Sequence, residues 1–95
     1  MNLYVNDLIL YANNTTKKIY YEPITAISKY GPTTVCSTEF HSFREDTLQV
    51  INPRLNFLEN WMERSRKDIE IIGVWRFNIQ NKNYDVIYYQ NKKEN

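Results

Sequence analysis

The stretch of sequence that decides the fold is Ile69-Glu70-Ile71-Ile72-Gly73-Val74-Trp75-Arg76-Phe77-Asn78-Ile79, followed by Gln80-Asn81-Lys82-Asn83 and then by Tyr84-Asp85-Val86-Ile87-Tyr88-Tyr89. β-branched and aromatic residues dominate both apolar runs, and these residues favour strands. The polar segment between them is typical of a turn, because Asn tolerates positive φ and bonds its own backbone. We therefore predict a hairpin with Trp75, Phe77 and Ile79 on one face and Val74, Arg76 and Asn78 on the other.

The first part of the chain predicts a second hairpin. Asp7–Ala12 is a short apolar run with strand propensity, and the polar segment 13–16 reads as a turn. Strand character resumes over Lys18–Ile27, although Pro23 cannot donate a ladder hydrogen bond and marks an edge, a bulge or a break. A third strand is predicted over Thr33–Phe40, which is β-branched and alternating. We expect His41–Asp46 to be a loop and Leu48–Ile51 to be a short extended segment.

A helix is predicted after these strands. Asn52 is a preferred helix N-cap, and Pro53 suits the first helical position, where a donor would be unpaired anyway. An apolar stripe follows at helical spacing. Its members are Leu55, Leu58, Trp61 and Met62.

These elements give an α+β fold class, in the order β-β-β-α-β-β. One long helix, Pro53–Lys67, is expected to pack on one face of a mostly antiparallel sheet. Residues 1–90 are predicted to form a single compact domain, and residues 91–95 a frayed tail.

Charge and length exclude several classes of function. The 95 residues carry 12 Lys and Arg against 11 Asp and Glu, so the formal net charge is +1. This balance gives no long-range attraction to nucleic acid or anionic lipid. Neither a secretory signal nor a membrane-spanning apolar run is recognisable, so we expect a cytoplasmic protein with no membrane partner.

No catalytic, metal or cofactor motif is recognisable in the sequence. Cys36 and His41 are the sole Cys and the sole His, and on one strand they would lie roughly 16 Å apart on opposite faces, so we do not expect them to be catalytic. Glu39, His41, Glu45 and Asp46 offer oxygen and nitrogen ligands without a metal-site spacing, and we interpret them as a solvated loop. A small hydrolase or nuclease that uses His41 with Glu39 or Glu45 is the third hypothesis.

Basic residues near the predicted helix end support the second hypothesis, a single-stranded nucleic-acid-binding domain. Arg64 and Arg66, together with Arg76, could form a patch near the tyrosines of the last strand. Stacking aromatic rings beside basic side chains are how sheet platforms hold single strands. Asp68 and Glu70 interrupt this patch, and no RNA-binding sheet motif is present.

The surplus of tyrosine supports the first hypothesis, a non-enzymatic protein-binding module. The chain has eight Tyr, more than one small helix can cover. The adjacent pairs Tyr20-Tyr21 and Tyr88-Tyr89 must point to opposite faces of an extended chain, so one ring of each pair faces away from the helix. Exposed Tyr on a rigid sheet is typical of protein recognition. The predicted contact residues are Tyr20, Tyr21, Tyr88, Tyr89, Arg64, Arg66 and Arg76.

The short, Asn-, Ile- and Lys-rich chain without catalytic motifs resembles small accessory proteins of phages and mobile elements in low-GC bacteria. The resemblance is one of composition and size. Many such proteins, including anti-CRISPR and other anti-defence proteins, bind one host protein. It therefore implies an inhibitor of a host defence or nucleic-acid-processing protein; a homodimer is also compatible with the sequence.

Overall fold

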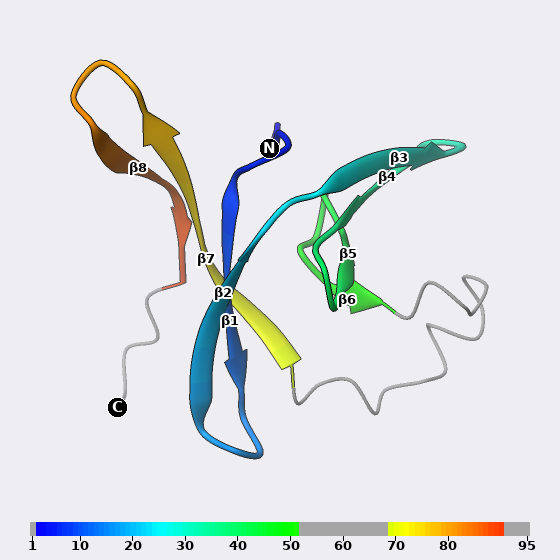
Figure 1. The fold of residues 1–95 in the computed structure, drawn as a ribbon. Coiled ribbons are helices and arrows are strands. Elements are labelled where there is room, and N and C mark those ends of the chain that lie inside the picture. Colours follow the sequence, from blue (N-terminus) through cyan, green and yellow to red (C-terminus); the bar gives the residue numbers. More distant parts are fainter. Residues whose placement is uncertain (1, 52–68, 91–95) are drawn as a thin grey trace.

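Two antiparallel four-stranded sheets make up the fold of residues 2–51 and 69–90, the part of the chain that the computed structural model describes (Figure 1). Sheet A has the strand order β2-β1-β7-β8, and sheet B the order β3-β4-β5-β6. The strands of sheet A are β1 Leu8–Asn13, β2 Lys18–Pro23, β7 Ile69–Asn78 and β8 Asn83–Tyr89. Those of sheet B are β3 Ala26–Tyr30, β4 Thr33–Ser37, β5 Ser42–Arg44 and β6 Val50–Ile51.

Asn side chains close both hairpins of sheet A, as the sequence predicts. In the β1–β2 turn, the Asn13 carboxamide oxygen accepts the N–H groups of Thr15 and Thr16, both at 3.0 Å, and Lys17 adopts a φ of 63°. In the β7–β8 turn, the Asn78 carboxamide oxygen accepts the N–H of Gln80 at 3.0 Å. Both predicted hairpins are therefore confirmed.

The chain leaves sheet A immediately after Pro23. The N–H of Ile24 donates to the carbonyl of Asp7 at 2.8 Å, and the N–H of Thr25 donates to the carbonyl of Ser37 at 2.8 Å. Consecutive residues thus bond to different sheets, and β2 continues into β3 as one curved ribbon (Figure 1). Pro23 ends β2 at the edge of sheet A, where a residue without an N–H donor is tolerated.

The hydrophobic core lies between the two sheets. Sheet A contributes Ile9, Tyr11, Ile71 and Val74, and sheet B contributes Cys36, Phe43 and Val50, with Leu3 and Ile24 beside them. We call the side of sheet A that carries these residues its inner face, and the opposite side its outer face.

The predicted α+β class is wrong. Every regular element of the described residues is a strand, and a second antiparallel sheet covers the inner face of sheet A where the sequence predicted a helix. The sequence treated Lys18–Ile27 as one strand of one sheet, but Ile24 redirects the chain into a second sheet. The predicted helix Pro53–Lys67 and the predicted tail 91–95 lie outside the described residues.

One predicted loop is also wrong. Within His41–Asp46, residues Ser42–Arg44 form β5, and Phe43 is fully buried opposite Cys36 of β4. This strand is difficult to recognise in the sequence, because its neighbours are polar and its three residues place only one apolar side chain in the core. The predicted extended segment before residue 52 corresponds to β6.

Candidate functional site

The outer face of sheet A is apolar across all four strands. Strand pairing places directly opposed residues on the same face, and successive residues alternate between faces. Leu10 of β1 lies opposite Tyr21 of β2 and Gly73 of β7, while Trp75 of β7 lies opposite Val86 of β8. The outer face therefore comprises Leu8, Leu10, Ala12, Ile19, Tyr21, Pro23, Gly73, Trp75, Phe77, Tyr84, Val86 and Tyr89.

Much of this face is open to solvent. The exposed fractions are 63% for Ile19, 68% for Tyr21, 58% for Val86 and 58% for Tyr89. The one charged residue that pairing places on this face of the described strands is Glu70, which lies at one corner opposite Ala12. Antiparallel sheets with one solvated face usually alternate apolar and polar residues, so this face departs from the usual pattern.

Trp75 lies flat on the sheet because Gly73 leaves room for it. A Cβ added to Gly73 would lie 2.0 Å from Cζ3 of the Trp75 indole. The ring of Tyr89 packs edge-on against Trp75 with centroids 6.0 Å apart, and Phe77 and Tyr84 form a similar pair at 5.3 Å. These contacts hold the aromatic rings in defined positions, which lowers the entropy lost when a ligand contacts them.

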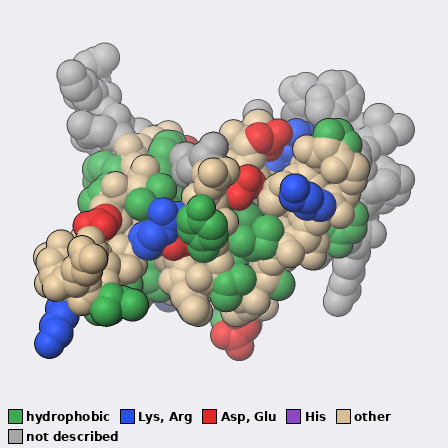
Figure 2. All heavy atoms as spheres, turned by 90° about the horizontal axis from the view of Figure 1, so that it is seen from above, with side chains coloured by type: hydrophobic (Ala, Val, Ile, Leu, Met, Phe, Trp, Pro, Cys, Tyr) green, Lys and Arg blue, Asp and Glu red, His purple; other side chains and the backbone are tan. Residues whose placement is uncertain are grey.

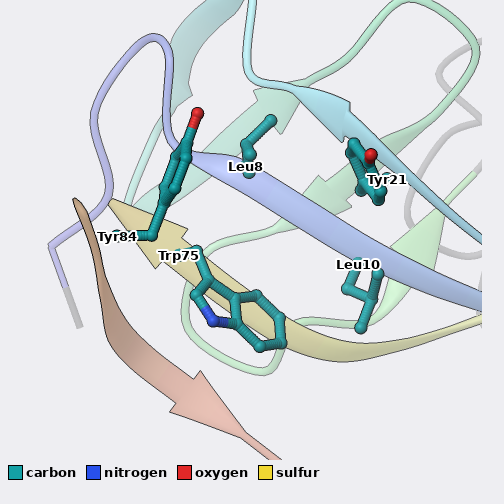
Figure 3. A pocket seen from close by; sticks show the side chains of 5 residues that line it. All are labelled: Leu8, Leu10, Tyr21, Trp75 and Tyr84. Carbon is teal, nitrogen blue, oxygen red and sulfur yellow. The ribbon is translucent and has the colours of Figure 1, made fainter. Parts of the chain in front are cut away.

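A hollow of about 430 Å³ opens in this face (Figure 3). Its walls come from all four strands, through Leu8, Leu10, Tyr21, Trp75 and Tyr84. Small-molecule and catalytic pockets normally contain a few convergent polar groups. This hollow is open and apolar, so it suits an apolar side chain of a partner better than a polar substrate.

The structure separates the two predicted tyrosine pairs as strand geometry requires. Tyr21 and Tyr89 lie on the outer face and are well exposed, whereas Tyr20 and Tyr88 are partly buried and pack against the core. Of the four predicted tyrosines, two are thus available to a partner. Strand alternation alone assigns the members of each pair to opposite faces, but it does not say which face is covered.

Arg76 does not share a face with the exposed aromatic rings. Its guanidinium lies on the side of Val74 and donates to both carboxylate oxygens of buried Asp7 at 2.9 Å and to the carbonyl of Asn2 at 3.0 Å. Its Cζ also lies 4.6 Å from the centre of the Tyr4 ring. Asp7 raises the pKa of Arg76 through the hydrogen bonds that hold it. Arg64 and Arg66 lie outside the described residues.

A polar cluster joins the two sheets on the inner side, and it includes a residue that the sequence analysis missed. One oxygen of Glu22, Oε1, accepts the Thr38 hydroxyl at 2.5 Å and lies 3.2 Å from Nδ1 of His41. The hydroxyl of Tyr11 lies 3.1 Å from that of Thr38, and the Tyr11 and His41 rings are 4.6 Å apart. Strand alternation places Glu22 and Tyr21 on opposite faces of β2, but it does not say which of the two faces is covered.

Two of the hypothesised hydrolase residues, His41 and Glu45, have other partners in the structure. His41 pairs with Glu22, while the Glu45 carboxylate accepts the N–H of Leu3 at 3.0 Å and Asp46 forms an ion pair with Arg44. Glu39 is exposed. Within residues 2–51 and 69–90, no group of three His, Cys, Asp or Glu side chains could hold a metal ion.

Cys36 is fully buried between the sheets, and burial raises the pKa of its thiol from 9.0 to about 11. Burial also raises the pKa of the Tyr11 hydroxyl strongly. A nucleophilic cysteine needs a thiolate at neutral pH. Cys36 therefore has the environment of a core residue.

Comparisons with known protein families, with characterised proteins and with solved structures find no match for this chain. Within the described residues, no helix is long and apolar enough to cross a membrane.

Proposed function

We propose that this chain is a non-enzymatic protein-binding module, and that it binds its partner with the outer face of sheet A. The observation that carries the proposal is a continuous apolar face, open to solvent, on a sheet whose other face already supplies the core. In line with the composition of the chain, we propose that it inhibits a host defence or nucleic-acid-processing protein by stoichiometric binding in the cytoplasm.

The size of the face supports a protein partner. Side chains of this kind bury about 150–250 Å² each when fully covered, so its half-exposed members together offer on the order of 600 Å². A typical monomer has a largest apolar patch of about 300–600 Å², and a standard interface buries about 800 Å² on each partner. The face is thus at the upper end for a free surface and close to the size of an interface.

The charge distribution favours protein over nucleic acid. Single-strand binders line their aromatic platforms with Lys and Arg. In the described part of sheet A, Arg76 lies on the opposite face and is paired with Asp7. Seen from above, side chains of both signs lie interspersed among hydrophobic ones, and those of the described residues form no basic stripe in this view (Figure 2).

These features define the chemistry of the partner. It presents an uncharged, apolar surface with one protruding aliphatic or aromatic side chain, which enters the hollow beside Trp75. Tyr21 and Tyr84 border the hollow and keep polar hydroxyls, which suits the rim of an interface.

The test compares capture of protein with binding of oligonucleotides. Immobilised wild-type chain is expected to retain one host protein at a one-to-one ratio, and Tyr21→Ala and Tyr89→Ala are expected to lose it. Tyr30→Ala is the matched control, because Tyr30 is 59% exposed but lies on β3 of sheet B. Single- and double-stranded oligonucleotides are titrated at 50 and 200 mM salt. Tight oligonucleotide binding that falls about a thousandfold between these salts would contradict the proposal.

A further inference from the structure

One row of side chains on the outer face of sheet A crosses all four strands. Leu10 of β1 pairs with Tyr21 of β2 and with Gly73 of β7. Gly73 in turn pairs with Tyr89 of β8. One register shift follows Leu10 and another precedes Trp75, so both lie beside the row and interrupt none of its pairs. The Trp75 indole covers Gly73, and the row therefore presents three aromatic rings, which we call the aromatic row.

The polar atoms of the aromatic row are hydrogen-bond donors. They are the hydroxyls of Tyr21 and Tyr89 and the indole Nε1–H of Trp75. A Tyr hydroxyl can donate or accept, whereas an indole N–H only donates. A ligand that covers the row must supply acceptors for these groups, because a buried donor without a partner is costly. The row carries no charge, so uncharged acceptors match it.

The backbone of the ligand decides whether it can supply such acceptors. An α-helix uses its carbonyls for its own hydrogen bonds, and an added strand pairs with the edge of a sheet and not with its face. A polyproline II segment has no internal hydrogen bonds, so its carbonyls are free to accept. Its prolines have no N–H that would oppose the indole donor. A proline-rich segment therefore offers uncharged acceptors alone.

The spacing of the aromatic row also matches a polyproline II segment. Neighbouring strands lie about 4.8 Å apart, so Tyr21 and Gly73, which are two strands apart, are separated by about 9.6 Å. A polyproline II helix has three residues per turn and rises about 3.1 Å per residue, so residues i and i+3 lie on one side about 9.3 Å apart. One prolyl ring thus meets Tyr21 when another meets the Trp75 indole. The hollow that Tyr21, Leu10 and Trp75 help to line lies along this path (Figure 3).

We propose that the partner docks a proline-rich segment in the polyproline II conformation along the aromatic row, transverse to the strands of sheet A. The inference rests on the proposed function and names the element of the partner that binds. A polyproline II helix is already formed before binding, so it loses little conformational entropy in an aromatic groove. The Trp75 and Tyr89 rings, whose centroids lie 6.0 Å apart, hold each other in place and lower the cost further.

An NMR titration with acetylated and amidated decaproline tests this preference. The control is an Ala-Gln repeat of the same length, which is also uncharged but keeps its backbone N–H groups. We expect decaproline to shift the amide signals of Tyr21 and Tyr89 and the indole Nε1–H signal of Trp75, with a Kd of about 1 mM or lower. The repeat should bind about tenfold more weakly or not at all. Equal binding of both peptides, or no saturable binding of decaproline up to about 5 mM, would overturn the proposal.

Two variants test the role of the aromatic row in the same titration. Tyr21→Ala should weaken decaproline binding about fivefold or more, while Tyr30→Ala, at a similarly exposed tyrosine of sheet B, should leave it within about twofold. Trp75→Phe keeps an aromatic ring but removes the indole donor, and it should weaken binding about threefold to tenfold. Unchanged affinity in Tyr21→Ala or in Trp75→Phe would overturn the proposal.

Competition separates this inference from the proposed function. Capture of a host protein that depends on Tyr21 and is released by decaproline supports both. Capture that depends on Tyr21 but persists in saturating decaproline would overturn the proline-rich partner and leave the protein-binding function standing. Decaproline bound along the aromatic row with no host protein captured would overturn the proposed function alone.

Discussion

The two faces of sheet A use the same kinds of side chain in opposite surroundings. Tyr11 on the inner face is fully buried, and Tyr21 on the outer face of the neighbouring strand is 68% exposed. The inner face has a reason to be apolar, because sheet B covers it. Within the described residues, no element of the fold covers the outer face, so burial does not explain its apolar side chains. The comparison explains the inner face by stability, and it is the basis of our proposal that the outer face serves binding.

The two faces of sheet A also differ in their polar groups. On the inner side, Glu22, Thr38 and His41 bond to one another and to Tyr11, as buried polar groups must. On the outer side, Glu70 occupies one corner and the centre is uncharged. An uncharged centre is the part of a surface that a protein partner can dehydrate at low cost.

Truncation of matched tyrosines tests the comparison with the largest expected effect. Tyr11→Ala should lower the free energy of unfolding by about 3–5 kcal/mol, because it leaves a cavity and removes the hydroxyl beside Thr38. Tyr21→Ala should change it by less than about 1 kcal/mol. Urea denaturation measures both. A cost for Tyr21→Ala as large as that for Tyr11→Ala would mean that the outer face serves stability.

Gly73→Ala sharpens the account of the outer face. The new methyl group would occupy the position of the Trp75 ring, so the ring must move, at a cost of about 1–3 kcal/mol for overpacking. We expect a changed Trp75 emission spectrum in a Trp61→Phe background. Gly31→Ala is the control: its added Cβ meets no atom within 4 Å, although the φ of 61° opposes the substitution. An unchanged emission spectrum in Gly73→Ala would contradict the position of the Trp75 ring over Gly73.

The inner face also predicts a loss of stability at high pH. Cys36 has a folded pKa of about 11 against 9.0 for the free group, so its contribution is complete below pH 9 and is lost as the pH rises toward 11. The largest loss is about 3 kcal/mol. Cys36→Ala should remove this part of the decline between pH 8.5 and 10.5, measured by urea denaturation. An identical pH dependence in that variant would place the thiol outside the core.

The sequence predicts the hairpins of sheet A well, because their signals are local. The segments around Asn13 and Asn78 carry turn chemistry, and β-branched and aromatic residues fill the strands on either side. Sheet B was harder to predict, since β5 and β6 have only three and two residues, and strands of that length show no alternating pattern of their own. The α+β prediction failed because one sheet was assumed to receive all the strands.

The candidate site could be predicted only in part. Alternation places Tyr20 and Tyr21 on opposite faces, but only the position of sheet B shows that Tyr21 is the exposed one. The same holds for Glu22, whose partners Thr38 and His41 belong to a later segment of the chain. Arg76 was predicted to contact the partner, and its pairing with Asp7 depends on two residues 69 positions apart.

Affinity for the captured partner tests the central claim most directly. Isothermal titration of that partner with wild type, Tyr21→Ala and Tyr30→Ala compares two tyrosines of similar exposure on different sheets. The account predicts that Tyr21→Ala raises the Kd about tenfold or more, as expected for truncation of an aromatic anchor, while Tyr30→Ala leaves it within about twofold. An unchanged Kd for Tyr21→Ala together with a raised Kd for Tyr30→Ala would contradict the account and move the docking surface to sheet B.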